Sequence, residues 1–468
     1  MNNRKALKSG VWYVISSFLV RGIGFLTTPI FSRLLSTAEF GLYNNYSSWM
    51  AIISVFVTLN LESTLIRAKY DYEESFDEYI LSMLGLSSLS ALIWLLVFNS
   101  FWFFFENVFG IEKFYINIMC CYLLLNPFIS MYLGRARYYF EYKKSAILST
   151  GVSICTAIIS VLLVVYLPNK LTGRIIGSAC PTILVGLVLA AYFFRIGKRI
   201  NIHYWRYALP ICMPYIPHVF SLIILNAVDR IMITKICGAT ENAIYSLAYS
   251  CASIITMLVG AMNSAFAPWI GEKLHENDYT IIKKVSRIYT IAFISGAIYI
   301  ILITPEIVSI LGGYRYKAGI WVLPPIAGGA IMQFMYCIFV NVEQFEKKTT
   351  WMAVASVSAA ILNYVLNVIF IPRYGYLAAA YTTLIGYTWL LISHMLIVYH
   401  YGFHTTFDYH FFISMIIICF VTVFISTVLF HHPILRLSVA FIYCILLIYG
   451  WLRYRKSIIK LLRRENKT

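Results

Sequence analysis

Charged side chains are scarce in this chain: only 12% of its 468 residues are Asp, Glu, Lys or Arg. A soluble globular protein carries roughly 25%. Since 60% of the residues are hydrophobic and 17% are aromatic, this scarcity excludes an ordinary soluble domain and indicates lipid surroundings. The net charge is +17, but the basic residues stand in short strips between apolar runs. That pattern is typical of loops facing anionic lipid, and we expect no nucleic-acid partner.

Motifs of soluble enzymes are also missing. The ten cysteines include no Cys-x-x-Cys pair, and almost all lie within apolar runs, so we interpret them as small helix residues. We find no phosphate-binding glycine loop and no Ser-His-Asp arrangement. The group His400, His404, Asp408 and His410 has no zinc-site spacing, and we expect no metal. These absences argue against catalysis, and the chain is not expected to be an enzyme.

Long apolar runs fill the rest of the chain. A membrane-spanning helix needs about 20 mostly apolar residues, and fourteen segments qualify. They are 10–32, 40–62, 79–104, 114–134, 145–167, 173–194, 208–235, 243–270, 288–311, 319–342, 349–371, 375–399, 410–430 and 434–452. The first is interpreted as a retained helix because its run continues to Pro29 without a signal-peptidase site. The sequence therefore predicts an all-α polytopic membrane protein.

The distribution of Lys and Arg predicts the orientation. With the N-terminus inside, the inner segments hold about three times as many Lys and Arg residues as the outer ones. Both termini are therefore expected in the cytoplasm. Residues 453–468 form a basic tail, which we expect to lie on anionic membrane lipid.

The two halves of the chain resemble each other. The segment from Arg33 to Tyr43 matches the segment from Lys235 to Tyr245, with a basic residue, a Glu and a Tyr at equal spacing. Lys143-Lys144 with Pro168 likewise matches Lys347-Lys348 with Pro372. These matches predict parallel six-helix repeats around a central cavity, suited to alternating access. We divide the chain into a first lobe (1–200), a second lobe (201–403), two extra helices (404–452) and the tail (453–468).

A few polar side chains within the expected spans are functional candidates, because charge inside a membrane is costly and usually faces the bundle interior. Ser17, Arg21 and Thr28 form a polar stripe on the first span. Other candidates follow on the seventh and eleventh spans: Asn226, Asp229, Arg230, Asn363 and Asn367. Arg33 and Lys235 close repeat-related spans. Each has a structural alternative, since these residues can also bond helices together or extend to lipid headgroups.

Three motifs resemble those of a known family. The opening segment from Ser9-Gly10 through Arg21 and Pro29 to Tyr43 resembles the start of Wzx-type O-antigen and polysaccharide flippases, within the multidrug/oligosaccharidyl-lipid/polysaccharide exporter superfamily. The segment from Asp229-Arg230 to Tyr245 is similar to the family's equivalent segment. So is Pro372-Arg-Tyr-Gly375, although Leu377-Ala378 stand where a second glycine is frequent.

The resemblance implies that the chain moves undecaprenyl-pyrophosphate-linked oligosaccharide from the inner to the outer leaflet of the bacterial cytoplasmic membrane. It implies no ATPase domain, a central cationic cavity and a monomer, with polysaccharide polymerase or ligase machinery as a possible partner. A pyrophosphate needs cationic donors, and Arg offers a bidentate fork. We therefore expect Arg21, Arg230, Arg33 and Lys235 to attract it, with Asp229 moderating Arg230. Asp229, Glu62 and Glu343 are the candidates for proton or sodium coupling; no other cofactor is expected.

Three rival functions stay open. A drug exporter of the same superfamily would favour an acidic cavity, whereas Arg21 and Arg230 outnumber Asp229 here. A membrane polymerase or ligase would need a large external loop, which the chain lacks. A lipid II flippase of the superfamily shares the expected fourteen spans, and only the opening segment favours the Wzx-type family.

Overall fold

The computed structural model describes residues 3–139, 141–346 and 349–463. Those residues form helices joined by short turns, with no strand among them. The long helices are α1 (Asn3–Leu34), α2 (Thr37–Thr58), α4 (Phe76–Ser100), α6 (Lys113–Tyr138), α7 (Tyr142–Tyr166), α8 (Lys170–Gly197), α10 (Ile216–Ile236), α11 (Ala239–His275), α12 (Tyr279–Leu302), α14 (Leu323–Phe345), α15 (Thr349–Tyr374), α16 (Tyr376–Val398), α17 (Tyr409–Leu429) and α18 (Pro433–Arg463). Short helices are α3 (Leu65–Asp71), α5 (Trp102–Phe109), α9 (His203–Cys212), α13 (Thr304–Gly312), η1 (Leu61–Thr64), η2 (Met213–Tyr215), η3 (Tyr314–Trp321) and η4 (Tyr399–Phe403). The predicted all-helical class is confirmed.

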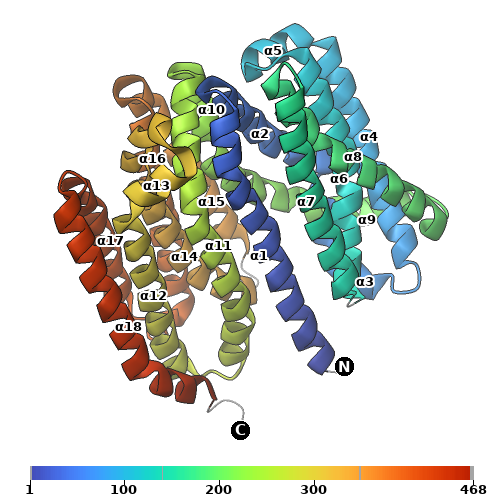
Figure 1. Cartoon of the computed structure of the whole chain (residues 1–468). Helices are drawn as coiled ribbons and strands as arrows, with labels where there is room; N and C mark the ends of the chain where they lie inside the picture. Colours follow the sequence, from blue (N-terminus) through green and yellow to red (C-terminus); the bar gives the residue numbers. More distant parts are fainter. Residues whose placement is uncertain (1–2, 140, 347–348, 464–468) are drawn as a thin grey trace.

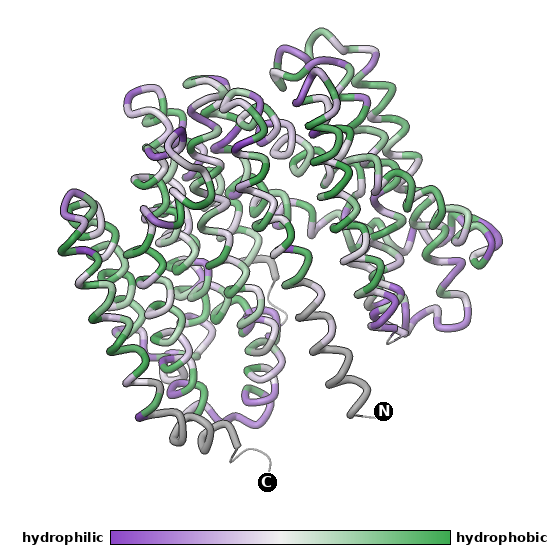
Figure 2. The backbone as a smooth tube through the Cα atoms, in the orientation of Figure 1, coloured by the Kyte–Doolittle hydropathy of each residue, from purple (hydrophilic) through white to green (hydrophobic). Residues whose placement is uncertain are grey.

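Each predicted span overlaps a long helix. Twelve of the described helices are long and apolar enough to cross a membrane, and α1 and α2 are not among those twelve. Figure 2 shows apolar residues along the middle of the bundle and hydrophilic ones toward its two ends. The start of α1 and the end of α18 lie at the same end of the bundle, which we call the terminal face (Figure 1).

Prolines divide the predicted span 208–235. Instead of one helix, the chain forms α9, η2 and α10, with Pro210 in α9, Pro214 in η2 and Pro217 at the start of α10. Proline lacks a backbone N–H and clashes with the preceding turn, so a continuous helix is disfavoured here. The predicted span 288–311 is divided in the same way, because α12 ends at Leu302 and α13 begins just before Pro305.

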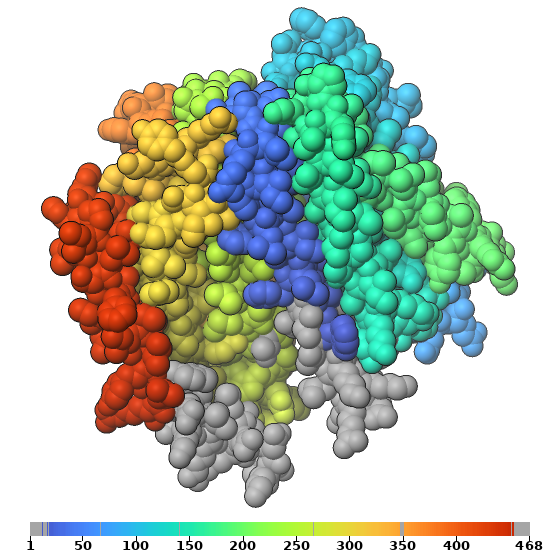
Figure 3. Space-filling view, viewed as in Figure 1, coloured from blue at the N-terminus to red at the C-terminus, as the bar shows by residue number. Residues whose placement is uncertain are grey.

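The helices pack in two groups. In the first half, α7 and α8 pack most extensively, and α4, α6 and α2 join them; in the second half the main contacts link α10, α11, α14, α15 and α16. The two groups meet where α2 packs on α10 and α11. In the space-filling view α1 lies between helices of the first half and helices of the second (Figure 3). A cavity between the two halves, as the repeat predicts, would lie at this boundary.

Repeat-related helices meet at that boundary. α2 begins with a capping box, in which the Ser36 hydroxyl accepts from the Glu39 N–H at 3.2 Å and the Glu39 carboxylate accepts from the Ser36 N–H at 2.8 Å. Its counterpart α11 begins after Gly238 at φ +114°. A side chain at Gly41 would place its Cβ 1.7 Å from the Ala239 carbonyl oxygen. Glycine is therefore required for this close helix contact.

Candidate functional site

A polar cavity lies between the two groups of helices. It consists of two adjoining parts of about 220 Å³ and 370 Å³, which share Asn60, Glu62 and Ser130. The walls come from α2, α4, α6 and η1 of the first half, and from η2 and α10 of the second. Leu59 and Asn60 have φ values of 52° and 50°, so α2 ends in a left-handed turn beside the cavity.

The cavity wall presents unused hydrogen-bonding atoms. The side-chain nitrogen of Asn60 and the hydroxyl of Ser87 are buried without a partner. Other polar lining residues are Ser54, Thr58, Ser63, Asn126 and Arg137. Glu62 and Arg137 supply one charge of each sign. Amide, hydroxyl and charged groups on one wall suit a sugar or another polyhydroxylated ligand, because buried polar atoms otherwise find partners.

The structure places Arg21 and Arg230 against one helix but at different depths. The Arg21 guanidinium lies 3.7 Å from where a Cβ on Gly260 of α11 would be. The Arg230 guanidinium lies 4.3 Å from the ring centroid of Tyr249, also on α11. Tyr249 and Gly260 occupy the same face of that helix, separated by roughly 16 Å at 1.5 Å per residue. The two arginines are therefore not joined in a single phosphate pocket.

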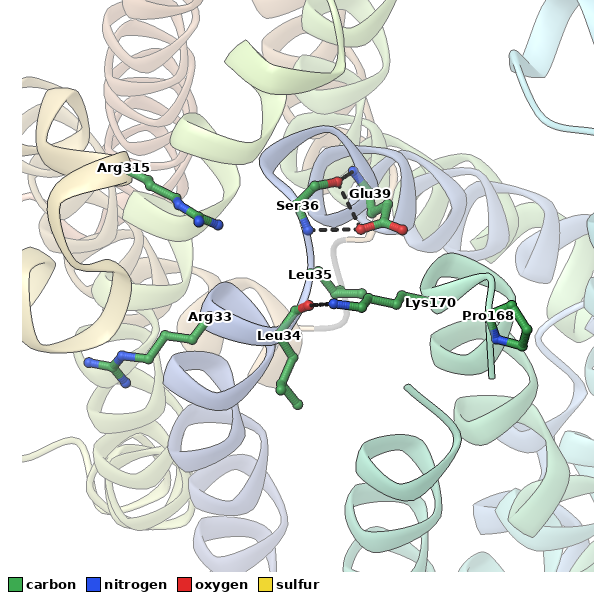
Figure 4. A pocket seen from close by; sticks show the side chains of 8 residues that line it. All are labelled: Arg33, Leu34, Leu35, Ser36, Glu39, Pro168, Lys170 and Arg315. Carbon is green, nitrogen blue, oxygen red and sulfur yellow. Dashed lines mark hydrogen bonds between the residues drawn. The ribbon is translucent and has the colours of Figure 1, made fainter. Parts of the chain in front are cut away.

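Arg33 and Lys235 are separated as well. Arg33 lines a depression of about 520 Å³ on the face opposite the termini, with Lys170 and Arg315, whereas Lys235 is not among its lining residues. Figure 4 shows Arg315 pointing toward this space, Arg33 pointing away and Lys170 reaching the Leu34 carbonyl. Lys170 donates to that carbonyl at 2.9 Å, and Arg33 donates to the Pro29 and Ile310 carbonyls at 3.1 and 2.9 Å.

Asp229 is the centre of a buried polar cluster. Its side chain is 1% exposed and accepts hydrogen bonds from Tyr245 at 2.6 Å, from Asn367 at 2.6 Å and from Thr383. These donors come from α11, α15 and α16, so one carboxylate joins three helices to α10. Among the described residues no ion pair joins Asp229 to Arg230, but the two groups are near enough to interact electrostatically. The moderating role of Asp229 stays a prediction.

The predicted asparagines extend the cluster. Asn367 donates to Asn363 at 3.3 Å and accepts from Thr382. Asn226, one turn from Asp229, accepts from Tyr249 and Tyr387, each at 2.8 Å. The structure therefore brings the predicted polar residues of the seventh and eleventh spans together.

The stripe predicted on the first span does not join them. Thr28 donates to the Gly24 carbonyl of its own helix at 3.1 Å, which is a local structural contact. Ser17 belongs to α1, but its side chain lies outside the described residues.

Sequence reasoning missed several members of these sites. Thr383 is one of the donors to Asp229, and Ser87 lines the same cavity as Asn60. Arg174, expected in an outer segment, has its guanidinium 3.6 Å from the Phe31 ring centroid and 4.3 Å from that of Tyr43. The sequence does show that Arg174 lies near a helix start and that the other residues are polar side chains on apolar helices. Which residues they contact depends on tertiary packing, which the sequence does not show.

The described helices and their hydropathy define an all-helical membrane protein with a cavity between its two groups of helices. The model for the family described as polysaccharide biosynthesis protein matches residues 6–274, more than half of the chain. The chain belongs to this family. A second model, MatE, matches residues 214–369.

Curated relatives share modest identity over most of the chain. An uncharacterized membrane protein of Methanocaldococcus jannaschii is 23% identical over 424 residues, covering 82% of each chain. Lsg locus putative protein 1 of Haemophilus influenzae is 20% identical over 380 residues, covering 78% of this chain and 91% of its own.

Solved structures show the same fold. The lipid II flippase MurJ in an inward closed conformation matches with a TM-score of 0.75 and 13% identity, covering 96% of this chain and 100% of that one. An inward-facing multidrug resistance MATE transporter of the MOP superfamily matches with a TM-score of 0.58 and 12% identity, covering 83% and 95%. These two likenesses concern the fold.

Proposed function

We propose that this protein moves undecaprenyl-pyrophosphate-linked oligosaccharide repeat units from the inner to the outer leaflet of a bacterial cytoplasmic membrane. It does so by alternating access and without chemical conversion of the substrate. The main support is the polar cavity between the two helix groups, with the unpartnered Asn60 amide and Ser87 hydroxyl on its wall. Membership of the polysaccharide biosynthesis family supports a saccharide cargo.

The separated arginines suit a moving substrate. A pyrophosphate carries about two negative charges, and a single site that bound it too tightly would retain it. Arg21 and Arg230 stand at successive depths along α11, so the headgroup can pass from one to the other. Arg33, on the far face, together with Lys235, then provides cations near the exit. The terminal face is the cytoplasmic face in this proposal.

The mechanical units are the two lobes predicted from the repeat, residues 1–200 and 201–403. They rock about the contact between α2 and the pair α10 and α11. Residues 404–452 stay with the second lobe, because α17 packs on α14 and α18 packs on α12. A single chain encloses the cavity, so a monomer suffices, and polymerase or ligase enzymes act on the product. The buried Asp229 is a candidate for binding a coupling proton or sodium ion.

The decisive experiment is deletion of the gene in its host, followed by extraction of lipid-linked sugars and determination of their leaflet. Repeat-length oligosaccharide on undecaprenyl pyrophosphate, trapped on the inner leaflet, is expected. Translocated but unpolymerised units would indicate a later step and contradict the proposal. Trapped lipid II would favour the lipid II flippase, whose fold the chain shares. An unchanged lipid pool with raised drug sensitivity would favour the multidrug exporter.

A further inference from the structure

Glu343 and His394 form a buried contact in the second half of the chain, apart from the cavity and from Asp229. Glu343 Oε1 and His394 Nδ1 lie 2.6 Å apart, joining α14 to α16, and both side chains are 0% exposed. The other polar atom of each group, Glu343 Oε2 and His394 Nε2, is buried without a hydrogen-bond partner. Buried polar atoms are nearly always hydrogen-bonded, so two unpartnered atoms on one pair call for an explanation.

The pair can exist in two proton states with the same heavy-atom contact. In one state, His394 Nδ1–H donates to the Glu343 carboxylate, and the pair carries one negative charge. The two unpartnered atoms, Glu343 Oε2 and His394 Nε2, are then both hydrogen-bond acceptors. In the other, the pair has gained one proton and is neutral overall. Burial of an uncompensated charge is strongly unfavourable, so the two states differ in how well they suit closed packing around the pair.

Among the described residues, the groups packed around the pair are aromatic rings and a second histidine. On α14 the ring of Tyr336 lies 4.8 Å from that of His394. From α10, His218 faces the same region, but its Nδ1 is 3.0 Å from the Ser356 hydroxyl of α15. Tyr401 of η4 is near enough to Glu343 to interact electrostatically, and the ring of Tyr215 in η2 lies 5.4 Å from that of His218.

Within the described ranges, His394 is the sole ion-pair partner of Glu343. Lys347 and Lys348, which follow Glu343 in the sequence, lie outside those ranges. Among the described ion pairs, the charge of this pair depends on its own protons.

Asp229 differs in this respect. Its oxygens already receive hydrogen bonds from Tyr245, Asn367 and Thr383, so no acceptor is left without a donor. Glu343 and His394 instead lie near the ends of α14 and α16 toward the terminal face, each with one unpartnered polar atom. Of the two buried carboxyl sites among the described residues, the pair is the one with hydrogen-bonding capacity left unused.

We propose that Glu343 and His394 together form a proton-binding site whose loading is coupled to transport. This inference rests on the proposed flippase function and names its coupling ion. The proton comes from water at the terminal face when the ends of α14 and α16 separate, and it is released when that region hydrates again. Protonation removes one buried charge and favours close packing of α14 on α16; deprotonation favours the hydrated arrangement.

Proton binding is tested first, without any substrate. Infrared difference spectra of the purified protein between neutral and acid pH report protonated carboxyl and imidazolium groups. A pH-dependent signal lost in both E343Q and H394Q, but retained in D229N and in the exposed-histidine control H410Q, is expected. Spectra in which E343Q and H394Q match the wild type would overturn the proton site, whatever the substrate proves to be.

Coupling is tested in proteoliposomes carrying undecaprenyl-pyrophosphate-linked oligosaccharide. An imposed proton gradient should change the wild-type flipping rate by roughly five-fold or more, the usual range for linked sites. E343Q and the double variant E343M/H394L should lose this dependence, while H410Q keeps it. The double variant replaces both partners with apolar groups, which preserves packing if E343Q alone proves unstable.

The outcomes separate the two proposals. If E343Q and the double variant show the same gradient dependence of flipping as the wild type, the coupling role of this pair is overturned. Wild-type flipping that is independent of the gradient would overturn it too, while leaving the proposed function intact. No flipping of the oligosaccharide lipid by the wild type, with the infrared signal present, would contradict the proposed function but not the proton site.

Discussion

The side-chain nitrogen of Asn242 donates a hydrogen bond to the carbonyl oxygen of Gly41 at 2.9 Å, joining α11 to its repeat-related partner α2. Asn242 is fully buried, and the helices approach so closely there that a Cβ on Gly41 would lie 1.7 Å from the Ala239 carbonyl oxygen. The contact lies toward the face opposite the termini, where both helices begin, and it holds the two halves together on that side.

Gly41→Ala is expected to separate α2 from α11, because a backbone atom cannot yield as a flexible side chain does. Overpacking usually lowers the free energy of unfolding by about 1–3 kcal/mol. We expect a loss at the upper end of this range, because the added Cβ would meet a backbone atom. Thermal unfolding in detergent and a cross-link between cysteines placed on α2 and α11 would measure the change. Gly151→Ala on α7 is the matched control, since a Cβ there meets nothing within 4 Å. Equal stability and cross-linking of the two variants would contradict the account.

The sequence predicted where the long helices lie, because bilayer thickness fixes the length of an apolar helix; it predicted fourteen spans, whereas twelve of the described helices are long and apolar enough. It could not predict the breaks at η2 and between α12 and α13, since proline in a membrane helix is often tolerated when neighbours satisfy the backbone. Repeat matching identified Arg33 to Tyr43 and Lys235 to Tyr245 as equivalents, and the structure places their helices in contact. That contact depends on the absence of a side chain at Gly41. The residues around Gly41 in the sequence do not indicate that another helix approaches so closely there.

The polar sites were only partly predictable. Asn363 and Asn367 share a helical face by spacing alone, so their proximity followed from periodicity. Their link to Asp229, and the donors Tyr245 and Thr383, depend on packing among four helices that no spacing reports. The contact of Glu343 with His394 is of the same kind, because the two residues come from different helices. Arg21 and Arg230 were expected together, and only the fold shows that α11 separates them by depth.

Asp229→Asn is expected to lower both stability and transport. The amide cannot accept at both ends, so one of the donors Tyr245, Asn367 and Thr383 loses its acceptor inside the core. An unsatisfied buried group costs about 1–3 kcal/mol. Thermal unfolding of D229N measures the effect. N226D serves for comparison, because Asn226 lies one turn away and is bonded to Tyr249 and Tyr387 instead. A D229N midpoint equal to the wild type would show that the cluster does not stabilise the fold.

Arg21 and Arg230 should contribute independently to flipping. Mutations farther apart than about 7–10 Å usually have additive free-energy effects, and these two contacts lie roughly 16 Å apart along α11. Arg21→Ala and Arg230→Ala are each expected to slow flipping by about ten-fold or more, and the double variant by the product of the two factors. Flipping in proteoliposomes is the measurement, with the exposed Arg373→Ala as control. A double variant no slower than either single would indicate one shared site instead.

Arg436 and Glu306 clamp α18 to α13. The Arg436 guanidinium is 3% exposed and donates to both Glu306 oxygens at 2.6 Å, and to the Leu302 carbonyl at 2.7 Å. Its hydrogen bonds lower the pKa of Glu306 below the ordinary value of 4.5. A lowered folded-state pKa stabilises the fold above the unfolded pKa, and that stabilisation is lost as the pH falls through the folded value.

Glu306→Gln should therefore be less stable than the wild type at neutral pH and differ little from it in acid well below pH 4.5. The glutamine keeps the shape of the side chain but leaves the buried Arg436 without a counter-charge, which is costly because the guanidinium stays ionised. Thermal unfolding across this pH range tests the expectation, with Glu112→Gln, an exposed carboxyl before α6, as the control. A wild-type advantage that persists unchanged into acid would show that the α18 clamp does not depend on this ion pair.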